Sequence, residues 1–257
     1  DARLEAAAIR DFRYVRARNP WSTQLSFSIS PTDNVNNGSV RDEISFAGVD
    51  GVVLSPTARA LSGLEISGGV ATRYTLSESR THRTRAGVSV FYETYVLSDE
   101  AQEMAPDASG SDFAYGSVAL TFGHEYRPEG WSGPLDLYGV AAWSWYGGER
   151  YGRTLQVSAA RGFTLSPRDR LRLRVSAERF TLEPDEDEFD RSTAYEAEAW
   201  WLHQFEGGAA LSLSVNQRES ESARASLDYS RTRLAAGYTL AEPVLGARTT
   251  LGLEMER

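Results

Sequence analysis

Leu171-Arg-Leu-Arg-Val-Ser-Ala-Glu178 alternates apolar and polar residues one by one, and Leu211-Ser-Leu-Ser-Val215 repeats the pattern. Because successive side chains of a strand point to opposite faces, a two-residue period predicts strands with one apolar face. The same period returns along most of the chain from Trp21 onward. Strands of about ten residues, repeated this often, are typical of an outer-membrane β-barrel. The sequence therefore predicts an all-β fold, an antiparallel transmembrane β-barrel.

The alternation predicts eleven long strands, separated by segments rich in Gly, Pro, Asn, Asp and Ser. One short extra strand is expected at 44–47, inside the long first connection. Within 224–240 the apolar positions shift from odd to even numbers, which predicts a bulge or a turn near Arg231. The eleven ranges are 21–30, 61–76, 83–97, 113–127, 135–146, 152–165, 170–182, 195–205, 209–218, 224–240 and 248–257.

Composition excludes several classes of protein. The 257 residues are 41% hydrophobic, with a mean hydropathy of −0.41, and contain no apolar run of the roughly 18 residues that a membrane-spanning helix needs. A low average does not argue against a barrel, because its lipid-facing and lumen-facing residues cancel. The chain has no cysteine, which excludes disulfides and thiolate metal sites. Its net charge of −9 argues against nucleic-acid binding.

Residues 1–18 differ from the rest and show apolar residues at helical spacing, before Asn19-Pro20 ends the pattern. We therefore expect residues 1–20 to be a short N-terminal helix and linker, the end of a preceding periplasmic helical domain. Residues 21–257 are expected to form the barrel. Short turns alternate with longer connections, and placing the short turns in the periplasm puts the N-terminus there too.

The predicted barrel is incomplete at its C-terminus. The chain stops at Glu254-Met-Glu-Arg257 without the aromatic residue that commonly ends such proteins. Eleven strands is also an odd number, whereas single-chain bacterial barrels usually have an even one. We expect a C-terminally truncated barrel whose intact form has 12–14 strands.

Charged side chains of both signs are expected on the polar face, where they would line a wet lumen. Aromatic residues near strand ends on the apolar face resemble the interfacial girdle of membrane barrels. A soluble sandwich or propeller also shows alternation, but its strands usually have five or six residues. The candidate lumen-lining residues are Arg73, Arg85, Glu93, Arg172, Arg174, Glu178, Glu196, Glu198 and Asp228.

No motif for catalysis, a metal or a cofactor emerges. His82, His124 and His203 lack paired ligand spacing. His124-Glu125 and nearby Asp residues would suit the acid–base site of a hydrolase, but the sequence shows no positioned nucleophile beside them. The segment 33–38 resembles part of a calcium loop without the closing Glu, so turn-forming Asx chemistry accounts for it better. The acidic run 183–188 is either a solvated loop or a site for cations or a basic partner.

The segment from Trp21 to Asn36 resembles the first barrel strand of the surface lipoprotein assembly modifier (Slam) family. In that family a strand follows a helix and enters an Asp-Ser/Asn-hydrophobic-Asn turn, which corresponds here to Asp33, Asn34, Val35 and Asn36. The start of the next strand, Leu61-Ser-Gly-Leu64, is similar as well. The family's periplasmic tetratricopeptide-like domain matches the predicted N-terminal helix, and its fourteen-stranded barrel matches the truncated strand count.

The resemblance implies a bacterial outer-membrane translocon that promotes surface display or secretion of lipoproteins or related client proteins. It implies no enzymatic activity, so no catalytic residues are carried over. The expected partners are outer-membrane lipid and the client, with the protein itself a monomer. The alternatives are a passive outer-membrane porin or solute channel, an outer-membrane hydrolase and a soluble β protein.

Overall fold

A single large sheet dominates the computed structural model, which describes residues 4–5, 19–41, 43–46, 49–183, 191–223 and 228–257. Eleven antiparallel strands pair in the order β1-β4-β5-β6-β7-β8-β9-β10-β11-β12-β13. Their bounds are β1 Trp21–Thr32, β4 Gly63–Glu78, β5 His82–Leu97, β6 Tyr115–Tyr126, β7 Leu135–Tyr146, β8 Glu149–Thr164, β9 Asp169–Leu182, β10 Arg191–Gln204, β11 Ala210–Ser222, β12 Tyr229–Thr239 and β13 Thr250–Glu256.

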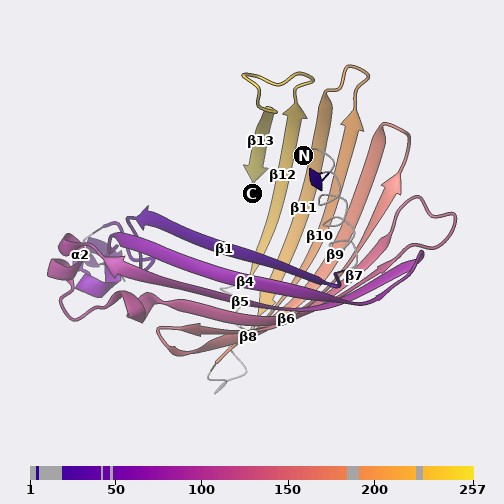
Figure 1. Cartoon of the computed structure of the whole chain (residues 1–257). Coiled ribbons are helices and arrows are strands. Elements are labelled where there is room, and N and C mark those ends of the chain that lie inside the picture. Colours follow the sequence, from indigo (N-terminus) through magenta and orange to yellow (C-terminus); the bar gives the residue numbers. More distant parts are fainter. Residues whose placement is uncertain (1–3, 6–18, 42, 47–48, 184–190, 224–227) are drawn as a thin grey trace.

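Each strand of the sheet lies beside the next long strand of the chain, so the topology is a meander (Figure 1). The sheet curls strongly, and β9–β13 rise from the part formed by β4–β8. Within the described residues β1 pairs only with β4 and β13 only with β12, so the sheet is open. A separate hairpin of β2 (Glu43–Phe46) and β3 (Val49–Val53) lies in the first connection.

The registers sort the side chains into two faces. On one face Val70 stands opposite Leu25 and Val90, and the same row continues through Val118 and Trp143. On the other face Gly69, Phe91 and Ser117 follow one another across the sheet. We name these the apolar face and the polar face. Large side chains on the apolar face are exposed: Leu25 to 78% and Phe27 to 73%.

The eleven predicted long strands are confirmed, and the short strand expected at 44–47 corresponds to β2. Some boundaries differ, because β10 already begins at Arg191 and β11 continues to Ser222. The prediction of a bulge or turn at Arg231 is wrong. Arg231 pairs with Arg218 in an unbroken register, and the odd-numbered Tyr229 begins β12 on the polar face, where its hydroxyl accepts from Arg218. Residues 224–227 lie outside the described ranges.

The connections fall at two ends of the sheet. The Trp21 end, where β1 begins, carries the connections β4–β5, β6–β7, β8–β9, β10–β11 and β12–β13. The opposite α2 end carries the others, including the helix α2 (Asp99–Met104) and the short 3-10 helices η1 (Pro56–Ala58) and η2 (Gly110–Phe113). Strict alternation of short and long connections is wrong. Only Gly147 and Gly148 join β7 to β8 at the α2 end, whereas residues 240–249 join β12 to β13 at the Trp21 end.

Buried hydrophobic packing is concentrated at the α2 end, where a small core joins the β1–β4 and β5–β6 connections. Leu61 is fully buried there. The side chain of Asn36 donates to the carbonyls of Thr57 and Arg59, at 2.8 and 2.7 Å, and accepts the Leu61 N–H at 3.0 Å. We name this region the Asn36 corner. Its buried members are Val35, Leu61, Ala101, Ala105 and Ala108.

Little of the predicted N-terminal helix is described. Leu4 and Glu5 are helical, and the other residues of 1–18 lie outside the described ranges. In the part of the chain that the structure describes, no helix has the length and apolar character needed to cross a membrane.

Candidate functional site on the polar face

The registers place eight of the nine candidate lumen-lining residues on the polar face. Asp228 lies outside the strands, just before β12, where its Oδ1 accepts the Ser222 N–H at 2.6 Å. The eight residues on the polar face are Arg73, Arg85, Glu93, Arg172, Arg174, Glu178, Glu196 and Glu198.

Five arginines gather on the polar face toward the Trp21 end, and we name them the arginine cluster. The alternation of the strands places them on this face. On β9, for example, Arg172 and Arg174 are two residues apart and share the polar face, whereas Leu173 between them lies on the apolar face. Because the sheet curls toward its polar face, arginines from β4 and β5 line the same cavity as those from β9. The cluster consists of Arg73, Arg83, Arg85, Arg172 and Arg174.

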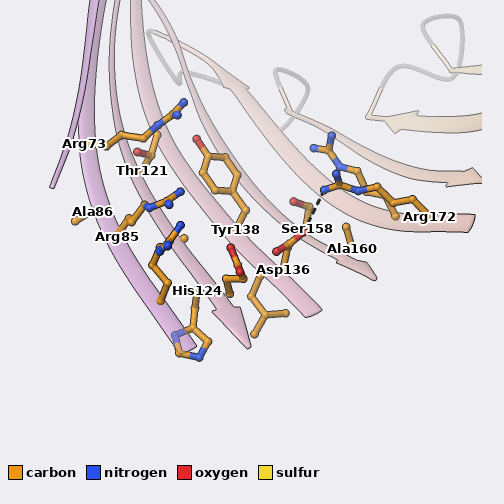
Figure 2. A pocket seen from close by; sticks show the side chains of 15 residues that line it. Arg73, Arg85, Ala86, Thr121, His124, Asp136, Tyr138, Ser158, Ala160 and Arg172 are labelled. Atoms are coloured by element: carbon orange, nitrogen blue, oxygen red, sulfur yellow. Dashed lines mark hydrogen bonds and ion pairs between the residues drawn. The ribbon is translucent and has the colours of Figure 1, made fainter. Parts of the chain in front are cut away.

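The cavity has a volume of about 350 Å³. Small or hydroxyl-bearing residues of β6, β7 and β8 form its floor, including Thr121, Tyr138 and Ser158. Figure 2 shows Arg73 and Arg85 on one side and Arg172 on the other, with the Tyr138 hydroxyl between them. Small side chains on the floor leave the guanidinium groups accessible from the open side of the sheet.

Only part of the cluster is neutralised. Arg83 Nε donates to Glu78 Oε1 at 2.7 Å, and Arg172 Nη2 lies 3.2 Å from Asp136 Oδ2. Among the described residues, the side chains of Arg73, Arg85 and Arg174 form no hydrogen bond or ion pair. The cluster thus presents three guanidinium groups whose hydrogen-bonding capacity is unused.

A second group of charges on the polar face forms one connected network, in which a single arginine contacts two carboxylates. Arg218 on β11 lies 2.7 Å from Glu178 on β9 and 3.2 Å from Glu196 on β10, and its Nε donates to the Tyr229 hydroxyl at 2.9 Å. Asn216 also donates to Glu196, at 2.8 Å. We name this the Arg218 network. The Arg218 side chain is only 18% exposed, so this arginine is held tightly between its partners.

The three histidines lie on the apolar face near the Trp21 end. His82 and His124 are brought together by the β5–β6 register, with ring centroids 6.1 Å apart. His203 binds Asp169 at 2.8 Å and packs edge-on against Phe205. Among the residues that the structure describes, no group of three or more His, Cys, Asp and Glu could hold a metal ion. His124 is among the residues that border the cavity, but its ring points away from the arginines (Figure 2).

The residues of the Trp21–Asn36 segment have identifiable packing and turn contacts. The ring of Trp21 lies 4.8 Å from that of Tyr74, centroid to centroid. Asn34 Nδ2 donates to the Gly38 carbonyl at 2.9 Å, and its Oδ1 accepts the Gly38 N–H at 2.8 Å. Asn36 forms the hydrogen bonds of the Asn36 corner. The Asp33 side chain is exposed. These contacts are the Asx turn chemistry predicted for 33–38.

Sequence reasoning missed several residues of the polar face. Arg83, Asp136 and Tyr138 line the cavity, and Arg218 is the central residue of the Arg218 network. The alternation within each strand was a sufficient signal for their face. Which of them meet depends on pairing between strands, which no local pattern encodes. The acidic run 183–188 lies, apart from Glu183, outside the described residues.

Neither the protein-family models nor the curated protein sequences include a match to this chain. The resemblance to the Slam family therefore rests on the residues quoted for it.

Proposed function

We propose that this chain is the membrane-spanning sheet of a bacterial outer-membrane β-barrel, with its polar face toward the lumen and its N-terminus in the periplasm. The exposed apolar face carries this proposal. Soluble monomers rarely expose contiguous apolar patches larger than a few hundred Å². Here Leu25, Val90, Leu120, Leu155 and Val175 are all exposed on one face of the eleven-stranded sheet.

The dimensions of the apolar face suit an outer membrane. Ten residue steps separate Leu135 from Trp145 on β7, which corresponds to about 33 Å along the strand. A strand tilt of about 40° reduces this to about 25 Å along the membrane normal, the height of the apolar band in such barrels.

Aromatic residues border the apolar face at both ends, as an interfacial girdle would. At the Trp21 end, Tyr126 packs against Trp131, and the Arg161 guanidinium lies 3.8 Å from the Trp131 ring centroid. Amphipathic rings favour the headgroup level of a bilayer. The rows comprise Trp21, Tyr74, Tyr126, Trp201 and Tyr238 at one end, and Tyr92, Trp143, Trp145 and Tyr195 at the other.

Extraction tests the membrane placement. The protein should partition with outer-membrane detergent extracts, and its gel mobility should change on boiling, because an unboiled barrel stays compact. Recovery from the aqueous fraction with unaltered mobility would identify a soluble β protein instead.

Within that placement, we propose that the barrel is a translocon that transfers a lipoprotein or related client protein to the cell surface. The resemblance of Trp21–Asn36 to the Slam family supports this role, and the polar face supplies the hydrated surface along which a client would pass. The client would engage from the periplasm, at the Trp21 end.

Surface exposure of the client tests the translocon. Protease accessibility of a lipoprotein encoded beside this protein should be high in intact cells that contain the protein and low in cells that lack it. A periplasmic protein serves as the control for membrane integrity. Equal accessibility in both strains would exclude the translocon role.

A passive solute channel is the second candidate. Small residues in the middle of the polar face favour it, because Gly69, Gly87, Ala119 and Ala142 add little side-chain volume there. A channel should conduct ions in planar bilayers without any client, whereas a translocon should stay closed until a client is added. The two candidates therefore differ in their basal conductance.

A further inference from the structure

The arginine cluster carries an excess of positive charge that the protein itself does not neutralise. Its cavity is lined by five arginines and by Glu125 and Asp136, and Arg83 is also paired with Glu78, so five positive charges face three negative ones. Glu125 is also engaged by Arg127, at 2.7 Å, outside the cluster. Unmatched like charges around one cavity repel each other, so a bound anion would lower the free energy of this arrangement.

The layout of the arginines favours an extended ligand. Arg85 on β5 and Arg174 on β9 are separated by three intervening strands, a path of about 19 Å along the sheet at the usual strand spacing. The curl of the sheet brings both toward one cavity. A single inorganic anion is too small to engage both sides, whereas a chain with several oxyanion groups can contact them together.

The charge of the whole protein restricts where such a ligand can dock. The chain has a net charge of −9, so most of its surface repels polyanions. The cluster is a local exception, and Thr121, Tyr138 and Ser158 add hydroxyl groups to its floor. Guanidinium groups bind carboxylates through two parallel hydrogen bonds, which gives both affinity and orientation.

We infer that the arginine cluster binds an acidic segment of a polypeptide, through carboxylates held by Arg73, Arg85 and Arg174. The inference rests on the proposed function in one respect: it identifies that segment as part of the client. The site lies toward the Trp21 end, where a client arriving from the periplasm would first meet the polar face.

Peptide binding tests the inference directly. The purified full chain in non-ionic detergent is titrated into a fluorescent peptide of ten glutamates at low ionic strength, and binding is followed by anisotropy. The double variant Arg85→Gln/Arg174→Gln should bind the peptide at least tenfold more weakly. The matched control Arg168→Gln/Arg233→Gln removes two charges as well, from residues paired with Glu206 and with Glu254 and Glu256, and should change binding less than twofold.

A second variant guards against a folding defect in the first. Ser158→Glu places a carboxylate inside the cavity and should also weaken peptide binding at least tenfold, while boiling still changes the gel mobility. Equal weakening in the control, or wild-type affinity in both test variants, would overturn the inference. Pyrophosphate that displaces the peptide completely at equal concentration would overturn it too, because the site would then be one for small anions.

The peptide experiment and the surface-exposure experiment test the two proposals separately. If client exposure does not depend on the protein while the cluster variants lose the peptide, the translocon proposal fails and the binding site stands. If exposure depends on the protein while the cluster variants keep the peptide, the inference fails and the translocon proposal stands.

Discussion

Arg218 and Arg174 lie on the same polar face, two strands apart, in different surroundings, although the charges of both act on Glu196. Arg218 has two carboxylates and a tyrosine hydroxyl as partners and is mostly buried. Arg174 lies half-buried in a cavity where positive charges outnumber negative ones. One residue type on one face thus connects strands of the sheet at Arg218, whereas at Arg174 it is the group that we propose to bind a ligand.

The largest effect is expected for Arg218→Gln. It leaves Glu178 and Glu196 as neighbouring half-buried carboxylates without their cation, and breaking a buried pair typically costs about 3 kcal/mol or more. We expect a loss of about 3 kcal/mol in the free energy of unfolding, measured by urea titration in lipid vesicles. Arg168→Gln, which removes an exposed pair, should cost less than about 0.5 kcal/mol. Similar losses in both variants would contradict the structural role of the network.

The Asn36 corner extends the comparison to uncharged groups. Asn36→Ala leaves two backbone carbonyls and the Leu61 N–H without their partner, and should destabilise the protein by about 2 kcal/mol. The control is Asp33→Ala in the same turn, because Asp33 is exposed; its effect should stay within about 0.5 kcal/mol. If Asn36→Ala and Asp33→Ala lowered the free energy of unfolding by the same amount, the stability of the Asn36 corner would not depend on the Asn36 amide.

Ser158→Glu should make the arginine cluster resemble the Arg218 network. The new carboxylate lies among unmatched guanidinium groups, so the free energy of unfolding should rise by about 1 kcal/mol, the upper range for partly exposed pairs. Ser212→Glu, on the polar face of β11 outside the cavity, serves as the control and should give no gain. If Ser158→Glu lowered the free energy of unfolding while the control left it unchanged, a carboxylate beside the arginine cluster would not be stabilising.

The smallest effect is expected for Arg85→Gln/Arg174→Gln. Relief of repulsion between like charges should raise the free energy of unfolding by about 0.5 kcal/mol at low ionic strength. In 1 M salt the gain should vanish, because the Debye length falls to about 3 Å. The sign is opposite to that of Arg218→Gln. A loss of stability that persists in high salt would place Arg85 and Arg174 in the same class as Arg218.

The strands and their faces could be predicted from sequence because a period of two is a local property. All eleven long strands follow it, and it placed Arg172 and Arg174 on the polar face. The contacts of Arg218 could not be predicted, because Glu178 lies forty residues earlier in the chain and meets it only through the registers of β9, β10 and β11. The phase shift near Arg231 misled for a related reason. Tyr229 reads as an apolar residue, but the register places it on the polar face, where Arg218 donates to its hydroxyl.

The Asn36 corner also bears on the order in which the sheet assembles. Residues 165–168 join β8 to β9, whereas residues 33–62 separate β1 from β4, a sevenfold longer connection that adds about 2 kcal/mol of closure entropy. Hairpins with short connections, such as β8–β9, can therefore form early from local contacts. β1 can pair with β4 only after the hydrogen bonds of the Asn36 amide and the burial of Leu61 have ordered the long connection between the two strands. The first strand of the chain is thus expected to be among the last to join the sheet, and loosening the corner would delay that step alone.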